Sequence, residues 1–255
     1  MFCHSQTKKL RLLINEKNNS GYNIKFWWRD DDISESTKEL KRLLDFSINN
    51  KLFVHLSVIP KYLSKNAINL IKKYNNVLVL QHGYEHKNNA DFGEPLNEFS
   101  CNRPLSNHIN NINLGFTDLS FNFGKQFIPI FVPPWHHISE TVIEQLSELG
   151  IRGISLIGDY NKKYNNLRNN NVHIDIHRWD SKTENNYQVK IRSYNEIIAE
   201  IYNIIFKIDD QQILIGILTH SQIMNINHWR IFRKVIRNLK KMDIEFIKND
   251  LNITS

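Results

Sequence analysis

The sequence predicts a single α/β domain, covering residues 1–255, in which about seven parallel strands form a barrel-like sheet. Short apolar runs alternate with amphipathic, helix-like segments along the whole chain. No linker or change of composition divides the chain into two parts. Polar residues also follow several of the apolar runs directly, and in a parallel barrel such residues gather at one rim.

In the first half of the chain, runs rich in β-branched and aromatic residues predict strands. These strands are expected at residues 22–28, 52–59, 76–81 and 127–132. The helices between them are expected at residues 34–49, 61–74 and 106–123, after a lead-in helix and loop in residues 1–21. Leu40, Leu43 and Leu44 form the apolar stripe of one helix, and Pro60 ends the second strand.

The second half continues the alternation. Strands are expected at residues 151–157, 172–179, 213–219 and 244–247, and helices at residues 139–149, 193–208 and 229–241. Ser139 is a suitable N-terminal cap, and Gly150 ends the same helix. The run 213–219 is apolar throughout, which is typical of a strand buried on both faces. Residues 90–103 and 158–171 are expected to be loops.

Composition excludes several classes of protein. Two cysteines, Cys3 and Cys101, do not form a disulfide framework, and no signal peptide or membrane-spanning run is recognisable. We therefore expect a cytoplasmic protein. The net charge is +7, but lysine is mixed with asparagine throughout the chain, so we expect no nucleic-acid partner. Oligomeric state is left open.

Two polar clusters at strand ends predict a metal site. His82 and His86 end the third strand four positions apart, a spacing that places both imidazoles on one side of a turn. Asp30, Asp31 and Asp32 end the first strand. One carboxylate with two imidazoles is a donor set that zinc accepts while keeping open coordination positions, as catalytic sites do. A second carboxylate beside such a ligand could act as a general base.

The clusters together resemble the motifs of the polysaccharide deacetylases of carbohydrate esterase family 4, the NodB-homology fold. The resemblance covers residues 22–220 and implies a deformed (β/α) barrel that holds a divalent metal, often zinc. The first family motif has a base followed by a metal ligand, which implies Asp31 and Asp32, with Asp30 and Asp31 as the alternative register. The second motif, His-x-x-x-His, implies His82 and His86 as ligands.

The third family motif, Arg-x-Pro followed by Tyr or Trp, is incomplete. Pro134 and Trp135 match it as substrate-binding residues, but Val132 stands where the motif has arginine. In the family this arginine steadies the catalytic aspartate. Arg29 or Arg178 could supply the charge from another strand, and the sequence does not choose between them.

The fourth and fifth motifs are also recognisable. Asp175 and Trp179 match Asp-x-x-Asp-Trp as substrate-binding residues, with Arg178 in place of the second aspartate. Ile217 and His220 match Leu-x-x-His, which implies His220 as the catalytic acid. The departures place the chain in a divergent branch of the family.

The resemblance implies hydrolysis of an acetyl amide on an N-acetylated, or less typically O-acetylated, sugar or glycan. Asp31 would take a proton from water, and His220 would protonate the leaving amine. The backbone N–H of Trp135 is the first donor available to the oxyanion, because Pro133 and Pro134 have none. Arg29 is expected beside the substrate.

Two alternatives stay open at this stage. The letters His-x-x-Glu-His, from His82 to His86, also spell the inverted zinc-protease motif, which needs a helix and uses Glu85 as the base. Gly83 and the preceding strand disfavour a helix there. The second alternative is a catalytically inactive barrel that binds glycans, because the arginine of the third motif is missing.

Overall fold

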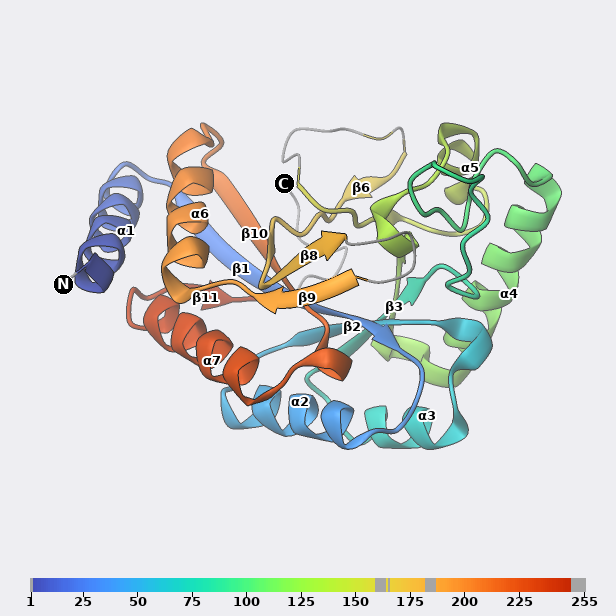
Figure 1. Cartoon of the computed structure of the whole chain (residues 1–255), viewed down its shortest axis with the longest axis horizontal. Coiled ribbons are helices and arrows are strands. Elements are labelled where there is room, and N and C mark those ends of the chain that lie inside the picture. The colour runs from blue at the N-terminus through green and yellow to red at the C-terminus, as the bar shows by residue number, and fades with distance from the viewer. Residues whose placement is uncertain (1, 159–163, 165, 182–186, 249–255) are drawn as a thin grey trace.

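The computed structural model describes residues 2–158, 164, 166–181 and 187–248. Figure 1 shows a curled sheet at the centre, with helices on its outer side. The helices are α1 (Phe2–Asn19), α2 (Lys38–Asn49), α3 (Lys65–Ile71), α4 (Leu105–Phe123), α5 (Glu140–Leu146), α6 (Tyr194–Lys207) and α7 (Ile226–Lys240). The strands are β1 (Asn23–Ile33), β2 (Val54–Val58), β3 (Val77–His82), β4 (Phe127–Val132), β5 (Gly153–Ile154), β6 (Arg168–Asn169), β7 (Ile174–Asp175), β8 (His177–Ser181), β9 (Tyr187–Ile191), β10 (Gln212–Thr219) and β11 (Glu245–Phe246).

The main sheet is parallel, as the sequence predicts, and the expected barrel-like sheet is a half-barrel. Its strand order is β6-β5-β4-β3-β2-β1-β10-β7, with β11 paired beside β1. Within the described residues the main sheet has nine strands, more than the predicted seven or so, because two-residue strands such as β6 and β11 give no periodic signal in the sequence. The longest contact in the sheet joins β1 to β10, in register from Asn23 opposite Gln212 to Asp30 opposite Thr219.

One predicted strand is wrong. Residues 172–179 are not continuous: β7 ends at Asp175, and β8 leaves the sheet to form an antiparallel hairpin with β9. The carboxylate of Asp175 accepts the backbone N–H of His177, and this contact removes the donor that a continuing strand would need. The break turns the His177 and Trp179 side chains toward the end of β10 instead of along the sheet.

Apolar packing explains why the strand ends are held in place. The largest cluster fills the space between the sheet and the helices of its outer side, with Trp28, Phe46 and Phe232 in mutual ring contact. A smaller cluster that includes Trp27 and Leu218 fills the inner side of the curl. Both clusters lie under the strands whose carboxyl ends carry the polar residues.

Among the described helices, none is long and apolar enough to cross a membrane.

Candidate active site

A bulge at the end of β1 separates its three aspartates. Asp30 pairs with Leu56 and Ile33 with Val58, so β1 has one residue more than β2 between these two positions. Asp32 takes up the bulge with a φ of 69°. In a regular strand consecutive side chains point to opposite faces, but here Asp31 and Asp32 both line the same pocket.

Asp30 does not reach that pocket. Its carboxylate accepts hydrogen bonds from the hydroxyl groups of Thr219 and Ser221 and from the backbone N–H of Ser221. Burial raises the pKa of Asp30 well above its usual value, although these hydrogen bonds oppose the rise. Asp30 therefore ties β1 to the segment that follows β10. The geometry favours the register in which Asp31 and Asp32 form the functional pair.

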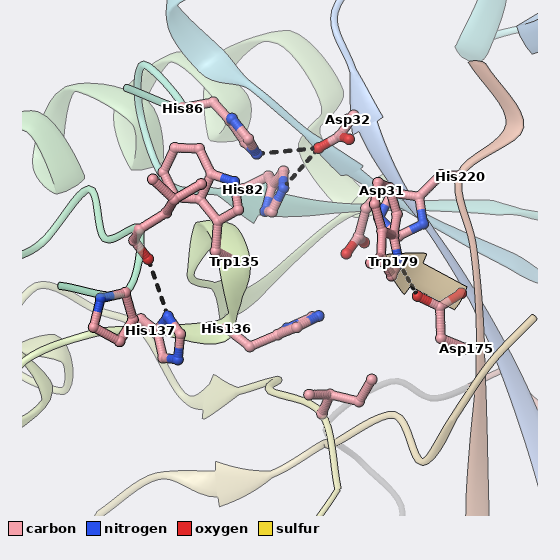
Figure 2. A pocket seen from close by; sticks show the side chains of 13 residues that line it. Asp31, Asp32, His82, His86, Trp135, His136, His137, Asp175, Trp179 and His220 are labelled. Atoms are coloured by element: carbon pink, nitrogen blue, oxygen red, sulfur yellow. Dashed lines mark hydrogen bonds and ion pairs between the residues drawn. The ribbon is translucent and has the colours of Figure 1, made fainter. Parts of the chain in front are cut away.

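Asp32 lies between the two histidines. Its Oδ1 is 3.1 Å from Nε2 of His82 and 3.3 Å from Nε2 of His86, and Figure 2 shows both rings pointing toward it. The Nδ1 of His82 donates to the carbonyl of Val132 at 2.9 Å, so Nε2 is the ring nitrogen that faces Asp32. Burial would raise the pKa of Asp32, but the hydrogen bonds from both histidines hold it well below its usual value.

This donor set fits a divalent metal ion. One carboxylate oxygen and two imidazole nitrogens lie within 4.8 Å of one another. Asp32 comes from the end of β1, His82 from the end of β3, and His86 from the turn that follows β3. The chemistry of the set, with one hard oxygen and two borderline nitrogens, is the one that zinc and neighbouring transition metals accept. The carbonyl behind His82 supplies the outer contact that such ligands usually have.

The turn that carries His86 excludes the geometry of the inverted protease motif. His82 is the last residue of β3, and residues 83–86 form a turn instead of a helix. The carboxylate of Glu85 points away from the metal donors and pairs with Nζ of Lys61 at 2.7 Å. Glu85 is therefore not placed to act as a base beside the two histidines.

Asp31 is held by Arg29 from the same strand. The Nη2 of Arg29 lies 2.8 Å from Oδ2 of Asp31, and its Nη1 donates to the carbonyl and the hydroxyl of Ser155. Burial would raise the pKa of Asp31, but the charge of Arg29 holds it below its usual value. Its second oxygen, Oδ1, has no hydrogen-bond partner within the described part of the chain. Arg178 instead pairs with Glu196 at the surface.

The opposite wall of the pocket carries His220. Its ring lies 4.8 Å from that of Trp179 and 5.4 Å from that of His177. Asp175 accepts hydrogen bonds from Nδ1 of His177 at 3.0 Å and from Nε1 of Trp179 at 2.7 Å. Burial would raise the pKa of Asp175, but the hydrogen bond from His177 holds it below its usual value. Asp175 thus fixes both rings that pack against His220.

Between these walls lies a pocket of about 350 Å³, the size of a small-molecule site. Trp135 and Trp179 line it together with the donor residues, and the ring of Trp135 lies 4.3 Å from that of His86. Pro134 and Arg29, expected at the substrate, do not line it. Pro134 is buried under the His86 turn, and Arg29 is fully buried behind Asp31.

Several residues at the site carry no recognisable pattern in the sequence. His136 and His137 line the pocket but follow Pro-Pro-Trp without a ligand-like spacing. Burial, together with the charge of Arg29, lowers the pKa of His136 to about 3 and keeps its ring neutral. Glu98, in the long loop before α4, is buried against the His86 turn. These residues can be recognised as parts of the site only when the topology of the sheet and loops is known.

The parallel half-barrel carries one aspartate and two histidines, a donor set suited to a metal ion, at the carboxyl ends of its strands. This combination of fold and site can be compared with known classes of protein. The fold is that of the polysaccharide deacetylases of carbohydrate esterase family 4, as the sequence motifs indicate. A family 4 carbohydrate esterase from Streptomyces lividans, solved in complex with acetate, matches with a TM-score of 0.54 at 15% identity, over 89% of this chain and 93% of that one.

Two further solved structures support the same fold. A polysaccharide deacetylase from Bacillus cereus matches with a TM-score of 0.54 at 15% identity, over 91% of this chain and 95% of that one. A family 4 acetyl xylan esterase from Clostridium thermocellum, in complex with a cobalt ion, matches with a TM-score of 0.51 at 14% identity, over 87% and 86%. No family model matches the sequence. No curated protein matches it either.

Proposed function

We propose that the protein is a metal-dependent hydrolase that removes the acetyl group from an N-acetylated, or O-acetylated, sugar or glycan. The observation that carries the proposal is the placement of Asp31 beside the donor set of Asp32, His82 and His86. The shared fold with acetyl-glycan esterases and deacetylases supports the same reaction class. On an N-acetylated substrate the reaction is hydrolysis of the C–N bond of a linear amide, and on an O-acetylated substrate it is hydrolysis of an ester.

Asp31 acts as the general base. Its Oδ2 is held by Arg29, so the carboxylate stays ionised at neutral pH, and its Oδ1 is left to take a proton from the attacking water. A divalent ion at Asp32, His82 and His86, most simply Zn²⁺, would polarise the acetyl carbonyl and lower the pKa of water toward about 7.

His220 acts as the general acid. It lines the pocket on the side opposite the His82–His86 pair. A proton on the ring can therefore pass to the leaving amine. The backbone N–H of Trp135, the first one after Pro133 and Pro134, donates to the developing oxyanion.

The apolar part of the pocket fits an acetylated sugar. Trp135, Trp179 and Leu96 present apolar surface, and an acetyl methyl group or the flat face of a pyranose ring packs on such surfaces. Trp179 is 41% exposed, and Asp175 holds its ring in place. The ring can therefore stack on a sugar without moving out of the protein core. A cytoplasmic location, on a soluble precursor of a glycan, stays a prediction.

Acetate release tests the proposal. The zinc-loaded protein is incubated with N-acetylglucosamine oligomers, peptidoglycan fragments and O-acetylated xylo-oligomers, and acetate is measured. We expect release from at least one of them, with loss of turnover in Asp31→Asn at an unchanged metal content. Binding of a glycan without acetate release from any substrate would instead support the inactive glycan-binding barrel.

Metal content gives the second arm of the test. Wild-type protein is expected to carry one divalent ion per chain, and His82→Ala to lose it. Glu85→Gln is the matched control, because Glu85 lies on the same turn but pairs with Lys61. A loss of turnover in Glu85→Gln as large as that in Asp31→Asn would contradict the assignment of the base.

A further inference from the structure

A single buried carboxylate holds the turn that carries His86. Glu98 is 1% exposed, and its two oxygens accept three successive backbone N–H groups. Oε1 accepts from Tyr84 at 3.0 Å and from Glu85 at 2.8 Å, and Oε2 accepts from His86 at 3.0 Å. Hydrogen bonds to an ionised acceptor are the stronger kind, so the three contacts fix the path of the turn.

The turn needs an outside partner for two reasons. It follows directly on β3, and after Gly83, whose N–H bonds to the carbonyl of Val132 in β4, the next three N–H groups bond to neither a helix nor a strand among the described residues. His86 also has a φ of 54°, a conformation that residues other than glycine seldom adopt without support. Without the Glu98 carboxylate, the turn would have both unpaired donors and an unfavourable backbone angle at the same residue.

Gly83 makes room for this contact. A Cβ atom at position 83 would lie 2.2 Å from Oε2 of Glu98 and 2.7 Å from the ring of Pro134. The φ of Gly83 is 53°, so a side chain there is also disfavoured by the backbone. Gly83 and Glu98 therefore form one unit, in which the small residue lets the carboxylate reach the N–H groups of the turn.

The loop that carries Glu98 is itself anchored. The backbone carbonyl of Glu98 accepts from the side chain of Asn89 at 2.8 Å. The next residue, Phe99, is fully buried and bridges to Ile138, just after the Pro133–His137 segment. The carboxylate is thus presented by a fixed backbone, and its effect reaches Nε2 of His86, 3.3 Å from Asp32.

We propose that Glu98 is a positioning residue that sets the affinity of the Asp32–His82–His86 centre by holding His86 in its ligating position. The inference rests on the proposed metal centre. Glu98 does not touch the donor atoms of the centre, and it acts through the three backbone N–H groups. His82, by contrast, is fixed independently by the carbonyl of Val132, so Glu98 governs one of the two imidazoles.

The test compares Glu98→Gln with Glu94→Gln. Glutamine keeps the size of the side chain, but its amide group presents N–H where one backbone N–H needs an acceptor. Glu94 is an exposed carboxylate on the same loop and serves as the matched control. The dissociation constant for Zn²⁺ is measured on metal-free protein by competition with a chromophoric chelator, together with the thermal unfolding midpoint of the metal-free protein.

We expect Glu98→Gln to bind Zn²⁺ about 10- to 100-fold more weakly than wild type, the range for outer contacts of metal ligands. Glu94→Gln should bind as wild type does. Amide hydrogen exchange at residues 84–86 in the metal-free protein should become faster in Glu98→Gln alone. Gly83→Ala, which displaces the Glu98 carboxylate, provides a second variant and should weaken Zn²⁺ binding in the same direction.

The outcomes separate the two proposals. If wild type binds Zn²⁺ and Glu98→Gln binds equally well, the positioning role is wrong while the metal centre stands. If wild type binds no divalent metal, both the centre and the role of Glu98 are wrong. A lower unfolding midpoint in Glu98→Gln with unchanged Zn²⁺ affinity would show that Glu98 merely stabilises the fold, and would also overturn the inference.

Discussion

Arg29 and Asp31 form an ion pair of 2.8 Å in which both side chains are buried. They stand two positions apart on β1, so the pleat of the strand places them on the same face. The family motif supplies this arginine from the fourth strand, where the chain has Val132. The charge that steadies Asp31, the proposed base, therefore comes from the strand that carries Asp31 itself.

Removing this charge should destabilise the protein strongly. Arg29→Met leaves the Asp31 carboxylate buried without its partner, and we expect a loss of about 3–5 kcal/mol in the free energy of unfolding, measured with urea. Adding Asp31→Asn to Arg29→Met should recover part of the loss, because the unpaired charge is gone. Arg178→Met, at an exposed ion pair, should change stability by less than about 1 kcal/mol. Equal losses in the two arginine variants would contradict the finding.

Substitution of the two aspartates of the bulge, Asp31 and Asp32, should affect the metal content of the protein differently. Asp32→Asn replaces the carboxylate that lies between His82 and His86 with a neutral amide, a much weaker metal donor, and we expect the variant to lose its divalent ion. Asp31→Asn should keep the ion, because Asp31 contacts Arg29 and not the histidines. Metal per chain, measured by mass spectrometry after dialysis, decides between the two registers. Loss of metal in Asp31→Asn with retention in Asp32→Asn would reverse the assignment.

Asp30 should be required for stability and not for metal binding. Asp30→Ala leaves the donors of Thr219 and Ser221 buried without an acceptor, and we expect a loss of about 2–4 kcal/mol in the free energy of unfolding. Asp30→Asn keeps one acceptor oxygen and should lose less. The folded fraction of either variant should carry the same metal per chain as wild type, and a metal-free folded variant would show that Asp30 has a part in the centre.

The stability of the protein should fall at acidic pH because of His173. Burial lowers the pKa of His173 to about 4, and its Nδ1 accepts the backbone N–H of Gly216. Between pH 6.5 and 4 the unfolded chain binds a proton that the folded protein does not, so the free energy of unfolding decreases as the pH falls through this window. The contribution above pH 6.5 is constant.

His173→Asn isolates this effect, because the asparagine oxygen can accept the same N–H group without titrating. We expect the loss of stability between pH 6.5 and 4 to be smaller in His173→Asn by roughly 2 kcal/mol, a figure reduced from the full pKa difference because the residue is partly exposed. Urea unfolding at pH 7, 5.5 and 4.5 provides the measurement. Parallel curves for wild type and variant would rule out His173 as the cause.

The sequence predicts the parallel, barrel-like sheet and the convergence of strand ends because both depend on local patterns. Apolar runs locate β1, β3 and β10, and parallel topology then brings Asp32, His82 and His220 to one rim. The choice between Arg29 and Arg178 could have been made from the two-residue period of β1.

Other features were beyond the sequence because they depend on tertiary contacts. The orientation of Asp30, Asp31 and Asp32 is set by the bulge opposite β2, which no residue pattern encodes. The end of β7 depends on a side chain accepting a backbone N–H two residues later. Glu98 acts across a loop through backbone groups, so its role leaves no motif.

The extra residue in β1 also makes the chemistry vulnerable to a change that the fold would survive. Deleting one residue between Asp30 and Ile33 would return the strand to simple pairing with β2, which the neighbouring sheet and core can accommodate. The residues at these positions are Asp31 and Asp32, so the deletion would remove one of the two pocket carboxylates, and the one that remains would follow the regular alternation of the strand. A scaffold of this kind can lose or regain its reactivity through the insertion or loss of one codon, with its overall shape unchanged.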